Sequence, residues 1–149
     1  MRAVVQRVKR ARVEVDGEVI GSIEAGLIAF VGAAREDGDL DLLYTVNKVV
    51  GLRVFASPAG KMGLSLAEVG GALLVVSQFT LFGDVRKGSR PSFSSALDPE
   101  AAEQLYGRFV DEARKRCVHV ATGRFRADMT VHVENDGPVT ILIDSRRLF

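Results

Sequence analysis

The sequence contains a single cysteine, Cys117, and no tryptophan among its 149 residues. One cysteine excludes a disulfide within the chain and a metal site built from four thiolates, and a lone cysteine is most often a core residue. Low cysteine usage is typical of a reducing compartment. We therefore expect a cytoplasmic protein in which Cys117 packs in the core.

Charge of one sign is not in excess either, because 20 lysine and arginine residues stand against 19 aspartate and glutamate residues. The overall charge predicts no polyanionic partner, so any contact with nucleic acid must come from local clusters of basic side chains. Long apolar runs are also missing. None approaches the roughly 20 residues of a membrane-spanning helix, and the charged N-terminal segment lacks the apolar stretch of a signal peptide. We expect no contact with a membrane.

Apolar residues make up 47% of the chain and occur in short runs, as expected for a single domain spanning residues 1–149. Strand-like runs separated by turn signals such as Asp16-Gly17 predict antiparallel strands in a meander. The expected strands cover 3–8, 11–15, 19–23, 27–32, 52–55, 73–76 and 118–121, followed by a final hairpin of 130–134 and 139–144. With two helices, this pattern predicts an α+β fold whose core is a mainly antiparallel, barrel-like sheet.

Two segments change to the helical period. The first, 39–50, has Asp37 and Asp39 near its start, where acidic side chains cap a helix and oppose its dipole. The second begins at Asp98 and Pro99 and continues to about residue 116. The expected buried residues are Leu40, Leu43, Tyr44, Val46, Val49 and Val50 in the first helix, and Leu105, Phe109, Val110 and Ala113 in the second.

The most informative stretch is 73–84, where a buried strand is followed by the polar residues Ser77, Gln78 and Thr80 around Phe79. Polar side chains at the end of a core strand, next to a charged loop, are a common position for a functional site. The alternative is an edge strand in which serine and threonine satisfy backbone groups. Composition alone leaves both interpretations open.

Conventional catalytic and metal sites have little support. A hydrolase set of Ser77, His132 and Asp144 rests on residue types alone, because no Gly-x-Ser-x-Gly turn surrounds Ser77. A metal site of His132, Glu134 and Asp136 lacks a fourth ligand. The sequence therefore predicts neither a metal nor a cofactor.

Arg86, Lys87 and Arg90 form a basic cluster in a loop with glycine, serine and proline. This loop is either solvated or in contact with phosphates. Two function classes remain open at this point. One is an enzyme that uses backbone groups and a polarised substrate, and the other is a non-catalytic RNA- or protein-binding module.

Four segments, 1–8, 76–81, 86–93 and 135–140, match the pattern of a known family. On these segments the chain resembles the D-aminoacyl-tRNA deacylases throughout its length. The Ser-Gln-Phe-Thr segment and the Gly-Pro segment near the C-terminus are the most characteristic matches.

The resemblance implies hydrolysis of the ester that joins a D-amino acid to the 3′-terminal adenosine of tRNA. Ser77, Gln78, Phe79 and Thr80 would form the catalytic segment. Backbone N–H groups around Gln78 and Phe79 would face the scissile carbonyl and stabilise the oxyanion without a side-chain nucleophile. The terminal ribose hydroxyl of the RNA would activate the attacking water.

The resemblance also implies a homodimer in which a cis Gly137-Pro138 segment of one subunit reaches the site of the other. That segment would exclude L-aminoacyl groups and so proofread chirality, while glycyl-tRNA would also be hydrolysed. The partner would be tRNA and not DNA, and the alternative function is an RNA-binding module without catalysis.

The implied tRNA-binding residues are Arg86, Lys87 and Arg90 on phosphates, with Phe125 and Met129 near the terminal adenosine. Two positions depart from the family pattern. Arg126 stands where the family usually has glycine, and Gly63 stands where asparagine is common.

Overall fold

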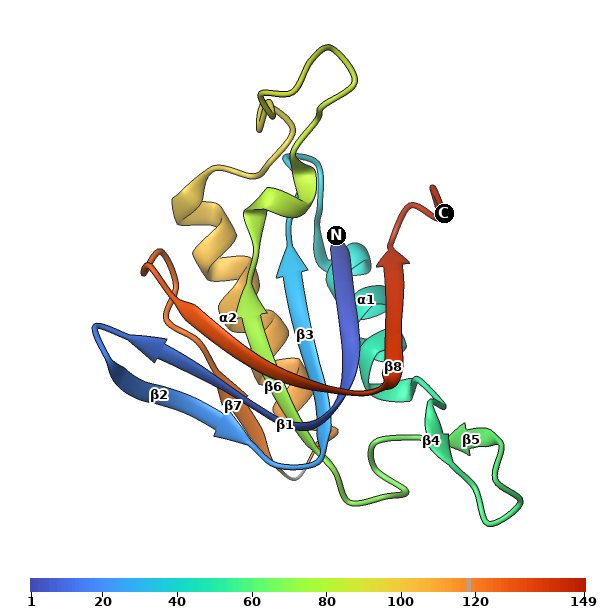
Figure 1. Cartoon of the computed structure of the whole chain (residues 1–149). Helices are drawn as coiled ribbons and strands as arrows, with labels where there is room; N and C mark the ends of the chain where they lie inside the picture. The colour runs from blue at the N-terminus through green and yellow to red at the C-terminus, as the bar shows by residue number, and fades with distance from the viewer. Residues whose placement is uncertain (118) are drawn as a thin grey trace.

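One mixed sheet forms the framework of the protein, and two helices lie against one of its faces (Figure 1). The computed structural model describes residues 1–117 and 119–149. The described strands are β1 (Arg2–Val15), β2 (Glu18–Ile23), β3 (Gly26–Gly32), β4 (Phe55–Ala56), β5 (Met62–Leu64), β6 (Ala72–Ser77), β7 (Val120–Thr122) and β8 (Thr130–Asp144). The helices are α1 (Asp39–Gly51), the short 3₁₀ helix η1 (Phe79–Phe82) and α2 (Pro99–Arg114).

The main sheet has the order β2-β1-β3-β6-β7, with β8 paired to β1. β1 is antiparallel to β2, β3 and β8, whereas β3–β6 and β6–β7 are parallel pairs. A Cβ added to Gly21 of β2 would lie 2.2 Å from the carbonyl oxygen of Thr122 in β7. This close approach nearly closes the sheet into a barrel, so the predicted α+β class with a barrel-like core and two principal helices is confirmed.

The predicted meander is wrong, because β3 pairs with β1 and not with β2. β2 occupies the second half of one edge of β1, pairing Ile23 with Ala11. β3 then occupies the first half of the same edge, pairing Gly26 with Val8. Along this one edge, the long strand β1 therefore pairs first with β3 and then with β2.

β8 is a continuous strand, so the predicted C-terminal hairpin is wrong. It pairs with β1 from Glu14 back to Arg2, and β1 itself is not divided at residues 9–10 as predicted. The register pairs Gln6 with Thr140 and Val8 with Asn135. Residues 136–139 consequently form a bulge opposite the single residue Arg7, in place of the predicted turn, with Gly137 and Pro138 exposed and Val139 buried.

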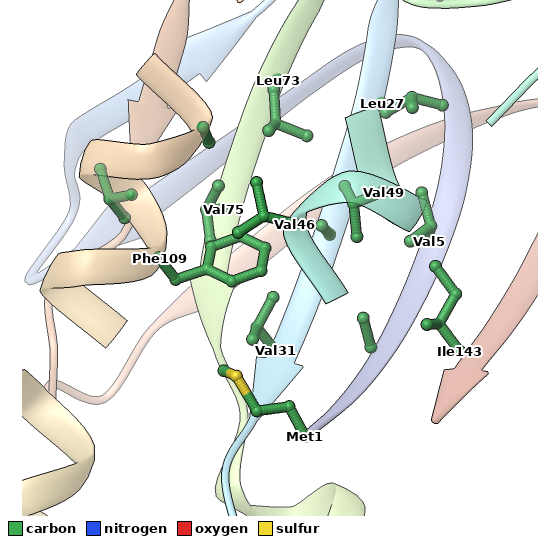
Figure 2. Close-up of a cluster of buried hydrophobic side chains, with 14 of the residues drawn as sticks. Met1, Val5, Leu27, Val31, Val46, Val49, Leu73, Val75, Phe109 and Ile143 are labelled. Carbon is green, nitrogen blue, oxygen red and sulfur yellow. The ribbon is translucent and has the colours of Figure 1, made fainter. Parts of the chain in front are cut away.

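Two apolar clusters fill the molecule, one on each face of the sheet. The first lies between the sheet and the helices, where the side chain of Phe109 points toward Val46 and Val75 (Figure 2). Burial of a side chain of that size stabilises the fold by about 2–3 kcal/mol. The second cluster fills the barrel and includes Val8, Val13, Ile23, Ile28, Leu74 and Val76.

The predicted buried face is confirmed for α2 and partly wrong for α1. α2 buries Leu105, Phe109, Val110 and Ala113 as expected, whereas Leu40 of α1 is 84% exposed. α1 instead buries Leu42, Thr45, Val46 and Val49. Thr45 tolerates burial because its hydroxyl donates a hydrogen bond to the carbonyl of Asp41, at 2.7 Å. Because Thr45 is polar, the apolar periodicity of the sequence did not indicate the correct buried face of α1.

Asp37 does not cap α1. Gly38 is the N-cap residue, and its N–H donates to the carboxylate of Asp41 at 3.0 Å. The carboxylate of Asp37 is buried, where it pairs with the α-ammonium group of Met1 at 2.7 Å. Asp37 therefore joins the start of β1 to the segment between β3 and α1.

Smaller differences concern element ends. The expected strand 52–55 is replaced by the short β4–β5 hairpin, and α2 ends at Arg114. Of the expected strand 118–121, Val118 lies outside the described residues, and the described strand β7 begins at Val120. Cys117 is half-buried and packs against the main core, as predicted. Among the helices in the described part of the chain, none is long and apolar enough to cross a membrane.

Candidate active site

The ends of β3 and β6 open into a cavity of about 640 Å³ beside the N-terminal end of α2. Its lining is mainly apolar and aromatic and includes Ser77, Gln78, Phe79, Phe125 and Met129. Five of the predicted site residues, from two distant segments, are therefore in one cavity. A mostly apolar cavity with a few polar groups is the usual form of a ligand site.

The backbone at the end of β6 defines the polar part of this cavity. The N–H of Gln78 donates to the carbonyl of Val31 in β3, at 2.8 Å, so it is not available to a substrate. This corrects the expectation that Gln78 supplies an oxyanion donor, because the parallel β3–β6 ladder continues one residue past Ser77. Within residues 1–117 and 119–149, the N–H groups of Phe79 and Thr80 have no hydrogen-bond acceptor. These are the donors that η1 presents.

Gly32 and Arg2 hold this turn in place. A Cβ added to Gly32 would lie 2.6 Å from the carbonyl oxygen of Gln78, so only glycine allows the turn to approach β3. The guanidinium of Arg2 donates to the carbonyl of Leu81 at 3.0 Å and to the carboxylate of Asp144 at 2.9 Å. The turn is thus fixed from both sides.

Among the residues that the structure describes, no catalytic base is paired with the hydroxyl groups of the turn. Gln78 donates a side-chain hydrogen bond to the hydroxyl oxygen of Thr80. His132 lies 3.3 Å from Glu14, in a separate groove, and Asp144 pairs with Arg2. The structure therefore contradicts a Ser77-His132-Asp144 set. Across the described residues, no group of three or more histidine, cysteine or acidic side chains is arranged to hold a metal.

Aromatic side chains line the cavity in two pairs. Phe125 and Tyr106, with ring centroids 6.0 Å apart, form an aromatic wall, and Phe93 meets Phe79 of the turn edge to face at 5.0 Å. The hydroxyl of Tyr106 donates to the carbonyl of Val75 at 2.9 Å, and burial raises the pKa of Tyr106 to about 12. Such faces suit stacking with a nucleobase.

The sequence pattern alone did not indicate Tyr106 and Phe93 as residues of this cavity. Tyr106 could have been found, because it precedes Phe109 by three positions and so lies beside it on the same face of α2. Phe93 follows a proline-containing loop, and no local pattern places it at the cavity.

Arg126 lines the mouth of the same cavity in an unusual backbone conformation. Its φ is 61°, in the left-handed region. A residue other than glycine costs about 1–2 kcal/mol there. A Cβ added to Gly123, three residues earlier, would lie 2.7 Å from the sulfur of Met129, so the flexible side chain of Met129 would have to move aside.

Gly137 and Pro138 are exposed and do not line the cavity of their own chain. They form the tip of the β8 bulge, and their peptide bond is cis. Arg7 donates to the carbonyl of Asp136 at 3.1 Å, and the side chain of Asn135 accepts from the N–H of Val139 at 2.8 Å. The bulge is therefore a well-braced exposed protrusion.

The basic loop projects from the end of the sheet at which η1 lies, at the top of Figure 1. Arg86 is bound to Asp84, with a shortest distance of 2.6 Å, and hydrogen bonds from Arg86 hold the pKa of that carboxyl well below its usual range. Lys87 and Arg90 are exposed. None of the three lines the cavity, but Arg86 lines an adjoining groove that shares Arg35 with it.

Comparisons with known proteins agree on one family. A family model described as D-Tyr-tRNA(Tyr) deacylase matches residues 4–144. The D-aminoacyl-tRNA deacylase of Sorangium cellulosum is 64% identical, and that of Anaeromyxobacter dehalogenans is 58% identical, each with both chains covered in full.

Solved structures with the same fold are also found. The c-Myc DNA Unwinding Element Binding Protein is 43% identical, with a TM-score of 0.92 and with 97% of this chain and 98% of that chain covered. A probable eukaryotic D-amino acid tRNA deacylase is 18% identical, with a TM-score of 0.79 and coverage of 96% and 98%. The second likeness concerns the fold alone.

Proposed function

The chain belongs to the D-Tyr-tRNA(Tyr) deacylase family, and we propose from this that it hydrolyses the ester between a D-amino acid and the 3′-terminal adenosine of tRNA. The reaction releases the free D-amino acid and intact tRNA. The observation that carries the proposal is the single cavity shared by the Ser77–Phe79 segment and by Phe125 and Met129. Its polar end suits the ester, and its aromatic wall suits the adenine.

The chemistry requires no side-chain nucleophile. The carbonyl oxygen of the ester accepts hydrogen bonds from the N–H groups of Phe79 and Thr80, which have no acceptor within the described residues. Fixed donors of this kind stabilise the negative charge that develops when water attacks. The neighbouring hydroxyl of the terminal ribose activates that water, which accounts for the lack of a base beside Thr80.

Chirality is selected by exclusion at the Gly137-Pro138 protrusion. A rigid backbone wall where an L side chain must project rejects every L-residue, whereas a pocket for the D side chain gains only about 1–3 kcal/mol per methylene. The bracing of the bulge by Arg7 and Asn135 supports this role. Glycine has no side chain to exclude, so glycyl-tRNA is hydrolysed as well.

The protrusion acts on a second copy of the chain. Gly137 and Pro138 are absent from the lining of their own cavity, which supports a contact with substrate held by a neighbouring subunit. A symmetric homodimer then contains two equivalent sites, each built from both chains.

Lys87 and Arg90 contact phosphates of the tRNA from the loop beside η1, with Arg86 contributing less because it is bound to Asp84. A tRNA substrate implies a cytoplasmic location. We expect no DNA partner.

Hydrolysis of matched D- and L-tyrosyl-tRNA tests the proposal, with glycyl-tRNA as the third substrate. The expected result is rapid release from D-tyrosyl-tRNA and glycyl-tRNA and none from L-tyrosyl-tRNA. Binding of tRNA without turnover of any of the three would instead favour a non-catalytic RNA-binding module. Duplex DNA serves as the binding control, since a 43% identical protein is named for binding a DNA element.

A further inference from the structure

We propose that Arg126 binds the phosphate on the 5′ side of the terminal adenosine and so helps to position the substrate at the mouth of the cavity. This assignment rests on the proposed function, because it takes the 3′ end of a tRNA as the ligand. Arg126 is thereby a positioning residue and not a catalytic one.

The first observation is the backbone of the segment that carries Arg126. Phe125, Arg126 and Ala127 all line the cavity, and the N–H of Ala127 closes a turn onto the carbonyl of Arg124 at 3.3 Å. Arg126 has a φ of 61° at the tip of this turn, where glycine would be free of strain. Arg126 is exposed and follows Phe125 of the aromatic wall directly in the chain.

The second observation is the balance of charge around the cavity. The cationic side chains in its lining are Arg35 and Arg126, and the carboxylate is that of Asp98. Arg35 lies 4.0 Å from Asp98, so its charge is partly compensated. Arg126 forms no ion pair within the part of the chain that the structure describes. The uncompensated charge at the mouth is therefore positive.

The terminal nucleotide places three groups around one ribose, with the aminoacyl ester on the 3′ oxygen, the adenine on C1′ and the phosphate on C5′. With the ester at Phe79 and the adenine against Phe125, the phosphate lies within one nucleotide of both groups. Arg126 follows Phe125 directly and lines the same cavity, so its guanidinium is within reach of that phosphate. Guanidinium groups bind phosphate through paired, charge-assisted hydrogen bonds.

Two non-hydrolysable ligands test the assignment by binding. One is the D-tyrosyl amide of 3′-amino-3′-deoxyadenosine with a free 5′-hydroxyl, and the other is the same compound with a 5′-phosphate. We expect the wild-type protein to bind the phosphorylated compound about tenfold more tightly at low salt, as expected for one charged hydrogen-bonded contact. Arg126→Gly should abolish this preference, and Arg126→Lys should retain part of it.

Arg124→Ala is the matched control, because Arg124 has the same charge, lies in the same turn, is exposed and does not line the cavity. It should keep the full preference for the phosphorylated compound. For intact tRNA, Arg126→Gly should reduce the salt slope of binding by about 0.7, the value for one phosphate of a single strand. The melting temperature of Arg126→Gly should not fall, because glycine relieves the backbone strain, so lost preference cannot be ascribed to unfolding.

The assignment is overturned if Arg126→Gly still prefers the phosphorylated compound tenfold, or if the wild type shows no preference. Binding of neither compound by the wild type would overturn both this assignment and the proposed site. A phosphate preference that depends on Arg126, in a protein that does not hydrolyse D-tyrosyl-tRNA, would refute the proposed function and leave the assignment standing.

Discussion

A heterodimer built from two inactive variants offers the sharpest test of a site shared between subunits. The first variant, Gly137→Ala, damages the protrusion. Its added Cβ would lie 3.0 Å from the backbone nitrogen of Val139 and 3.1 Å from the guanidinium of Arg7. The φ of 134° is also one that residues other than glycine rarely adopt. The strain costs about 1–3 kcal/mol, which the bulge can relieve only by moving.

The matched control is Gly107→Ala. It makes the same chemical change in α2, where a Cβ meets nothing within 4 Å. This variant should be fully active and more stable by about 1 kcal/mol, because alanine is the better helix former. The second inactive variant, Phe125→Glu, leaves the protrusion intact and places a charge in the aromatic wall of the cavity.

Each variant alone should be inactive on D-tyrosyl-tRNA although folded, as checked by its melting temperature. Co-expression with two different C-terminal tags and purification through both gives the heterodimer. One of its two sites then combines the intact cavity of the Gly137→Ala chain with the intact protrusion of the Phe125→Glu chain, so about half of the wild-type activity per dimer should return. An inactive heterodimer would refute the reasoning, and a fully active Gly137→Ala homodimer would show that the protrusion has no role.

Three further predictions concern single groups. Thr80→Ala should keep most of the activity in single-turnover assays, because the hydroxyl lacks a base and is a poor nucleophile; trapping an aminoacyl adduct on Thr80 would contradict this. Lys87→Ala and Arg90→Ala should each reduce the salt slope of tRNA binding by about 0.7–0.9, with a smaller change for Arg86→Ala, since that guanidinium is already bound to a carboxylate; equal slopes in all variants would mean a solvated loop. Tyr106→Phe should have a free energy of unfolding about 1 kcal/mol below that of the wild type at neutral pH, because it lacks one hydrogen bond. The wild type should then lose this advantage as the pH rises from about 10 toward 12, because the hydroxyl ionises in the unfolded chain before it does in the folded one; urea titrations of both proteins that stay parallel through this range would contradict the burial argument.

The sequence by itself determined the local elements and the segments that carry function. Short apolar runs predicted most strands, and the spacing of Leu105, Phe109, Val110 and Ala113 predicted the buried face of α2, because such patterns follow directly from strand and helix geometry. The position of the polar residues at the end of β6 singled them out, and the resemblance to a known family then favoured a functional role over an edge strand. These features depend on residues within a few positions of one another, and the amino-acid sequence alone contains that information.

The tertiary structure decided what those segments face. The bulge at 136–139 depends on the distant strand β1, which pairs with β8 on both sides of the bulge and leaves Arg7 opposite the extra residues of β8. The N–H of Gln78 is hydrogen-bonded to Val31 because β3 runs parallel beside it. This pairing between distant segments, which the local sequence does not contain, is the reason that the free N–H groups begin at Phe79. The left-handed backbone of Arg126 is likewise a property of its turn. Pairings between segments far apart in the chain determine which hydrogen-bonding groups have no partner within the protein. Those groups are the ones that can bind a substrate.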